Sequence, residues 1–79
     1  MKPSKIAVLG GGSWGTTTAS VISRNCRTVL WARDATIVGQ VNREHRNHRY
    51  LDDAALHPKL TATENIQSAV SEADAVLIA

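Results

Sequence analysis

A short apolar run leads directly into a glycine-rich turn near the start of the chain. The run is Lys5 to Leu9, and Gly10, Gly12 and Gly15 follow it with the spacing G-x-G-x-x-G. A helix-compatible stretch comes next, so the glycines join an expected strand to an expected helix. This arrangement is typical of a β-α-β turn that cradles the pyrophosphate of a dinucleotide. The sequence therefore indicates dinucleotide binding, and the alternative is a glycine-rich turn without a ligand.

The spacing of the three glycines matches the chemistry of such a turn. Gly10 allows a sharp bend at the end of the strand, and Gly12 leaves the backbone open to a phosphate because it has no Cβ. Gly15 allows the helix to pack close to the strand. The first turn of that helix offers free N–H groups and the positive end of the helix dipole to the phosphates.

Size and composition narrow the class of protein. Its 79 residues make one small domain at most, the size of one mononucleotide-binding half of a Rossmann sheet. A net charge of +2 gives no case for a general nucleic-acid binder, and the single Cys26 excludes an internal disulfide. No run approaches the roughly 20 apolar residues of a membrane span, and residues 1–5 lack the apolar region of a signal peptide. We expect a cytoplasmic protein without a membrane span.

Alternating strand and helix patterns predict an α/β fold. Strands are expected at residues 5–9, 28–32, 59–61 and 75–79, and helices from residue 13 or 14 to about 25, at 35–44 and at 64–72. The order β-α-β-α-β-α-β with short links implies a Rossmann-type parallel sheet with right-handed crossovers. The purely apolar run 75–79 at the end of the chain indicates a piece of a longer protein. Residues 1–79 are therefore expected to form a partial dinucleotide-binding domain.

Caps and apolar faces refine the expected helices. Asp34 is the expected N-cap of the second helix, and Thr63 is the expected N-cap of the third. The stretch from His45 to His57 is expected to be irregular, and Trp31 is expected in the core. The apolar faces of the three helices are expected to be Ala19, Val21 and Ile22, then Ile37, Val38 and Val41, then Ile66, Ala69 and Val70.

Several segments together resemble one known family. They are Ile6 to Gly10, Gly12 to Thr16, Leu30 to Asp34, Asn47 to Leu51, and Leu60 to Thr63. Over nearly the whole chain they resemble the N-terminal part of bacterial NAD(P)-dependent glycerol-3-phosphate dehydrogenase. The resemblance implies hydride transfer between NAD(P)H and dihydroxyacetone phosphate, giving sn-glycerol 3-phosphate for phospholipid synthesis. It also implies a homodimeric parent enzyme whose helical substrate domain and catalytic lysine lie beyond Ala79, so that this chain carries no catalytic residue.

The chain departs from the family pattern at a few positions. Gly11 stands where the family usually has Ala, and it is expected to cost some ordering entropy. Thr17 and Thr18 replace the usual Ala-Leu, and Cys26-Arg27 replaces a turn that usually contains Gly-His. These departures concern loop geometry and leave the cofactor assignment in place.

Four side chains are expected near the cofactor besides the glycines. By resemblance Ser13 and Trp14 contact it, although Ser13 also suits a plain N-cap and Trp14 a surface aromatic. Arg33 follows the second strand, where an acid usually binds the ribose of NAD and an arginine the 2′-phosphate of NADP. Because Asp34 is better used as a helix cap, NADPH is favoured over NADH. Tyr50 matches a family position near the cofactor, and a packing role stays open.

Other functions stay open at this point. Another two-domain enzyme, such as a hydroxyacid dehydrogenase or a ketopantoate-type reductase, has the same glycine turn, and so does a non-enzymatic dinucleotide-binding module. A basic stretch suits a solvated helix end better than an RNA or phosphate site; it comprises Arg43, His45, Arg46, His48 and Arg49. The histidines, including His57, have no cysteine or paired carboxylate in a ligand pattern, so no metal site is expected.

Overall fold

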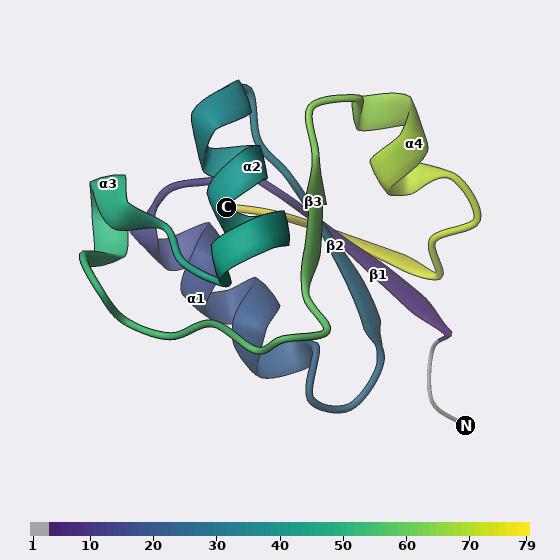
Figure 1. Cartoon of the computed structure of the whole chain (residues 1–79). Coiled ribbons are helices and arrows are strands. Elements are labelled where there is room, and N and C mark those ends of the chain that lie inside the picture. Colours follow the sequence, from purple (N-terminus) through teal and green to yellow (C-terminus); the bar gives the residue numbers. More distant parts are fainter. Residues whose placement is uncertain (1–3) are drawn as a thin grey trace.

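The chain folds as a parallel sheet with helices on both faces (Figure 1). The computed structural model describes residues 4–79. Residues 1–3 of the segment that was expected to lack a signal peptide lie outside the described residues. The elements in chain order are β1 (Lys5–Leu9), α1 (Ser13–Ile22), β2 (Arg27–Trp31), α2 (Ala35–Glu44), α3 (His48–Leu51), β3 (Thr61–Thr63), α4 (Ile66–Val70) and β4 (Ala75–Ile78). The four strands have the order β3-β2-β1-β4, and all pairs are parallel. The predicted Rossmann-type α/β fold is confirmed.

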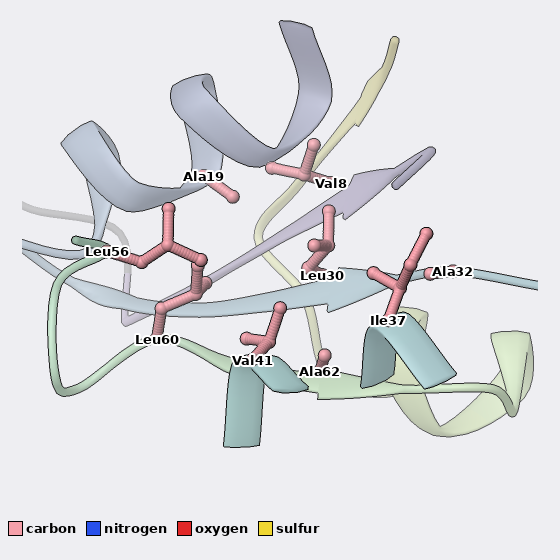
Figure 2. Packing of buried hydrophobic residues seen from close by; sticks show 9 residues of the cluster. All are labelled: Val8, Ala19, Leu30, Ala32, Ile37, Val41, Leu56, Leu60 and Ala62. Carbon is pink, nitrogen blue, oxygen red and sulfur yellow. The ribbon is translucent and has the colours of Figure 1, made fainter. Parts of the chain in front are cut away.

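The sheet divides the core into two layers. Val8 and Leu30 face α1 and α2, whereas their neighbours Ala7 and Val29 face α4, where they pack with Ala69. Successive residues of a strand point to opposite faces, and both faces are covered here, so β1 and β2 consist of nearly continuous apolar runs. Figure 2 shows the larger cluster, which comprises Val8, Ala19, Leu30, Ala32, Ile37, Val41, Leu56, Leu60 and Ala62.

The first helix is shorter than predicted. α1 ends at Ile22 and not near Asn25, because the N–H groups of Arg24 and Asn25 bond back only three residues. Their acceptors are the carbonyls of Val21 and Ile22, so the chain tightens and turns into β2, which begins one residue early. Ile22 packs against the larger cluster as predicted, but Val21 is 55% exposed, and its expected burial is wrong.

The second helix forms as predicted. Asp34 caps α2, since its Oδ1 accepts a hydrogen bond from the Thr36 N–H at 2.8 Å. Ile37 and Val41 are buried, and Val38 packs partly buried against the same cluster. A local capping signal and an apolar face of period 3.6 agree here, which explains why both ends of the helix were predictable.

The connection after α2 is more ordered than predicted. α3 interrupts the expected irregular stretch, and Leu56 is buried in the core. The Leu56 N–H donates to the His45 carbonyl at 2.9 Å, and the His57 N–H donates to Ser20 Oγ at 2.8 Å. Leu60 then packs into the core ahead of the strand, so that β3 begins at Thr61 and not at residue 59.

The last helix and its cap differ from the prediction. α4 covers residues 66–70, shorter than the expected 64–72, and Asn65 is its N-cap. Asn65 Oδ1 accepts from the Ser68 N–H at 3.0 Å, whereas Thr63 still belongs to β3 and bonds the Asn65 N–H. Ala69 is buried and Val70 partly buried, but Ile66 is 44% exposed, contrary to the prediction. Trp31 is only partly buried, and its Nε1 donates to the Glu64 carbonyl at 2.8 Å.

Candidate functional site

A cavity of about 470 Å³ opens where β1 and β2 end. Its lining comes from the loops after both strands, from α2 and from α3, and comprises Gly11, Gly12, Ala32, Arg33, Asp34, Ile37, Arg49 and Tyr50. Ligands of open α/β sheets bind outside the carboxyl ends of the strands, which is the position of this cavity. The fold therefore brings three of the predicted site residues, Gly12, Arg33 and Tyr50, around one space.

The glycines of the loop differ in what surrounds them. Gly10 has a φ of +128°, and a Cβ there would lie 2.9 Å from the Ala79 carbonyl oxygen. A Cβ on Gly15 would collide with the carbonyl oxygen of Gly10, so this glycine allows α1 to approach the end of β1. A Cβ on Gly12 would meet no atom within 4 Å. The loop is thus tightly packed at its two ends and open in the middle.

Gly11 has a structural reason that the sequence does not reveal. A Cβ at this position would lie 2.7 Å from the Cβ of Ala32, closer than such atoms pack. The glycine loop and the end of β2 therefore approach each other closely under the cavity. Gly11, where the family usually has Ala, fits this close contact because it has no Cβ. It still carries the ordering entropy of a glycine.

Asp34 has both carboxylate oxygens engaged. Its Oδ1 caps α2, and its Oδ2 lies 3.3 Å from Nη1 of Arg49. The Arg49 guanidinium lies 5.2 Å from the centre of the Tyr50 ring, in cation–π range. Arg33 is exposed and forms no ion pair with any residue between 4 and 79. Two arginines therefore border the cavity beside one carboxylate, which favours an anionic ligand.

Ser13 and Trp14 do not line the cavity but adjoin Gly12 in the first turn of α1. The N-cap of α1 is Gly12, and no side chain caps the helix, so the structure does not support the alternative in which Ser13 is a plain N-cap. Ser13 is exposed, and Trp14 is 73% exposed. Gly10 and Gly15 likewise lie outside the lining. Gly10 packs close to Ala79, and Gly15 packs close to Gly10.

Arg49 is the cavity residue that sequence reasoning missed most clearly. The sequence places it with the solvated basic stretch, and its side chain is indeed 63% exposed, yet it lines the cavity and bonds Asp34. The other members of that stretch do not line the cavity. The position of Arg49 directly before Tyr50 was the available signal, because both lie in the single turn of α3.

Within residues 4–79, no three side chains of His, Cys, Asp or Glu gather as they would around a metal ion. No helix in the same range is long and apolar enough to cross a bilayer.

The chain matches known proteins over nearly its whole length. Residues 5–79 match the model of the NAD-dependent glycerol-3-phosphate dehydrogenase N-terminus. The chain is 49% identical over 75 residues to glycerol-3-phosphate dehydrogenase (NAD(P)+) 2 of Sphingopyxis alaskensis, which covers 95% of this chain and 22% of that protein. A glycerol-3-phosphate dehydrogenase (NAD(P)+) of Leuconostoc mesenteroides is 51% identical over 75 residues, covering 94% of the chain and 22% of that protein.

Solved structures show the same relationship. The glycerol-3-phosphate dehydrogenase structure from Coxiella burnetii superposes with a TM-score of 0.82 at 32% identity. The match covers 94% of this chain and 23% of that one. The chain thus spans about a fifth of the length of the curated relatives it matches.

Proposed function

Because the chain belongs to the family of the NAD-dependent glycerol-3-phosphate dehydrogenase N-terminus, we propose that it binds the dinucleotide of such an enzyme, NADPH or NADH. The observation that carries the proposal is the cavity at the ends of β1 and β2, which joins the glycine loop to two arginines. The family match favours this reading over a hydroxyacid dehydrogenase or a ketopantoate-type reductase.

The glycine loop is proposed to hold the pyrophosphate. Gly12 leaves open space where a Cβ would stand, so a phosphate has access to the backbone. The first N–H groups of α1 lack intrahelical acceptors, and those of Ser13 and Trp14 belong to this set. Gly10 and Gly15 hold the turn that aims these groups. A helix start of this kind binds phosphate through N–H groups and the helix dipole together.

A preference for NADPH is proposed from the charges around the cavity. A site for NAD usually offers a free carboxylate to the ribose 2′-hydroxyl. Asp34 is the carboxylate in the lining, and each of its oxygens already has one partner, the Thr36 N–H for Oδ1 and Arg49 for Oδ2. Arg33 has no competing carboxylate and suits a 2′-phosphate, for which a guanidinium offers paired donors. Tyr50 is proposed to cover the cofactor from α3.

The activity of the whole enzyme is proposed from the relatives. It interconverts dihydroxyacetone phosphate and sn-glycerol 3-phosphate, and the bound nicotinamide supplies or accepts the hydride. The residues of this chain bind and orient the cofactor, while a helical domain elsewhere in the enzyme provides the substrate site and the catalytic lysine. A cytoplasmic homodimer that feeds phospholipid synthesis completes the proposal.

Parallel titration with NADPH and NADH tests the binding proposal. The fluorescence of Trp14 and Trp31 reports binding, because both indoles are partly or largely exposed near the ends of β1 and β2. We expect saturable quenching with tighter binding of NADPH. Arg33→Ala should weaken NADPH binding by about tenfold, or about 1.4 kcal/mol, and leave NADH nearly unchanged. Arg43→Ala is the matched control, since Arg43 lies outside the cavity lining.

Two results would count against the proposal at different levels. Absence of binding by a chain with native circular dichroism would refute the dinucleotide site. Equal affinities for both cofactors, unchanged by Arg33→Ala, would refute the NADPH preference alone.

A further inference from the structure

A buried asparagine connects the glycine loop to a distant part of the chain. Asn47 is 0% exposed and directly precedes α3. Its Nδ2 lies 2.9 Å from the Gly11 carbonyl oxygen and 3.0 Å from Thr16 Oγ1, across 36 and 31 residues of sequence. The Thr16 hydroxyl in turn donates to the same Gly11 carbonyl at 3.2 Å. These bonds therefore hold the carbonyl of Gly11, which lines the cavity together with Gly12.

The orientation of this amide is fixed by its partners. The Gly11 carbonyl only accepts hydrogen bonds, so Asn47 must face it with the nitrogen and not with the oxygen. Asn47 Oδ1 is buried and has no hydrogen-bond partner between residues 4 and 79. The side chain therefore acts as a double donor toward the loop, and a residue that cannot donate leaves the Thr16 hydroxyl as the side-chain donor to the Gly11 carbonyl.

Asn47 also contacts α3, the helix that carries the lining residues Arg49 and Tyr50. Asn47 is the N-cap residue of α3, and its carbonyl accepts the Leu51 N–H at 2.9 Å. Arg49 and Tyr50 lie within that helix and line the cavity with the glycine loop. One buried residue thus ties together the phosphate loop and the segment that carries the arginine and the tyrosine.

We propose that Asn47 is a positioning residue for the dinucleotide: its amide holds the glycine loop and α3 in one arrangement, so that the cavity is preformed before the cofactor binds. This inference rests on the proposed function of the cavity. Preformed loops bind more tightly because less conformational entropy is lost on binding. Loss of the amide must therefore lower affinity for the cofactor, and not only the stability of the fold.

A matched amide elsewhere in the fold separates positioning from stability. Asn42 also makes two side-chain hydrogen bonds to backbone, with the Ala62 carbonyl at 2.9 Å and the Ala62 N–H at 2.8 Å. It joins α2 to β3 and does not line the cavity. Asn42→Ala therefore also removes two side-chain hydrogen bonds, one donated and one accepted, from a place where the proposal assigns no role in binding.

The test compares Asn47→Ala with Asn42→Ala in NADPH titrations and in amide hydrogen exchange of the ¹⁵N-labelled chain. We expect Asn47→Ala to raise the Kd for NADPH by about tenfold and to speed exchange at Thr16, whose N–H donates to the Gly12 carbonyl at 3.0 Å. Asn42→Ala should leave the Kd within about twofold of the wild type, because it lies outside the site, and should speed exchange in β3. Thr16→Val removes one donor to Gly11 at similar volume, and it serves if Asn47→Ala does not fold.

The outcomes distinguish this inference from the proposed function. A folded Asn47→Ala or Thr16→Val chain that binds NADPH with wild-type affinity overturns the positioning role. An equal loss of affinity in Asn42→Ala overturns it too, because the effect would then follow general stability. A folded wild-type chain that binds no dinucleotide overturns the proposed function together with the inference.

Discussion

Substitution of Gly15 by alanine should lower the stability of the fold, whereas substitution of Gly12 by alanine should lower the affinity for NADPH. In Gly15→Ala the added Cβ collides with the Gly10 backbone, so we expect a loss of about 1–3 kcal/mol in the free energy of unfolding. In Gly12→Ala the Cβ enters open space, so stability should change by less than about 1 kcal/mol. In the proposed complex the same Cβ stands where the pyrophosphate approaches, so NADPH binding should weaken strongly.

Urea unfolding and NADPH titration of both variants check this pair. A Gly15→Ala chain as stable as the wild type would contradict the packing role of Gly15. A Gly12→Ala chain with unchanged affinity would contradict the approach of the phosphate at that point.

Single residues were predictable where their role is local. The approach of Gly15 to the Gly10 carbonyl and the Asp34 cap depend on neighbours within a few positions, and their geometry follows the sequence pattern. The donor role of Asn47 and the place of Arg49 in the cavity depend on contacts with residues 36 and 15 positions away. A linear pattern does not encode such contacts, so the roles of these two residues are seen only in the structure.

At the scale of elements, length decided what the sequence could predict. β1 and α2 have strong, uninterrupted patterns and were placed correctly. α3, β3 and α4 have between three and five residues each. Elements this short form because tertiary contacts, such as the burial of Leu56 and Leu60, hold them in place, and local propensity alone does not locate them.

The link between β1 and β4 should give the chain a defined response to acid. The Asp74 carboxylate accepts hydrogen bonds from the Ser4 hydroxyl and from the N–H groups of Lys5 and Ser4. These bonds, the Ser4 hydroxyl first, hold the pKa of Asp74 below its ordinary value. The ionised carboxylate therefore stabilises the fold above the pKa of the unfolded chain, and this contribution is lost as the pH falls through the lowered native pKa.

We expect Asp74→Asn to lower the Tm at pH 7, with a difference from the wild type that shrinks below about pH 4. Asp53→Asn is the matched control, because its side chain is 95% exposed and contacts only His48 among the described ion pairs. Thermal unfolding of the three chains across this range is the measurement. A Tm difference that stays constant down to the acid limit would show that Asp74 does not act through its charge.

At the scale of the whole molecule, β4 leaves an apolar edge uncovered. It is the outermost strand beside β1, and Val76, Leu77 and Ile78 are 44%, 40% and 84% exposed. An exposed apolar edge strand is a template for pairing with another chain. We therefore expect concentration-dependent association of this chain, and Ile78→Lys should reduce it with native circular dichroism retained. Sedimentation velocity measures this.

Val21→Lys is the control for this prediction, because Val21 is an exposed apolar residue on α1, away from the edge. Equal suppression by both variants would point to general solubility and away from the β4 edge. A wild-type chain that stays monomeric at every concentration would contradict the prediction outright.

The cavity at the ends of β1 and β2 is proposed to bind a dinucleotide. The most direct measurement is the change in amide chemical shifts of the ¹⁵N-labelled chain on addition of NADPH. We expect the largest changes at Gly11, Gly12 and Tyr50, which line that cavity. Shifts confined to the second cavity, of about 310 Å³ near residues 23–27 and Lys59, or no shifts in a folded chain, would contradict it.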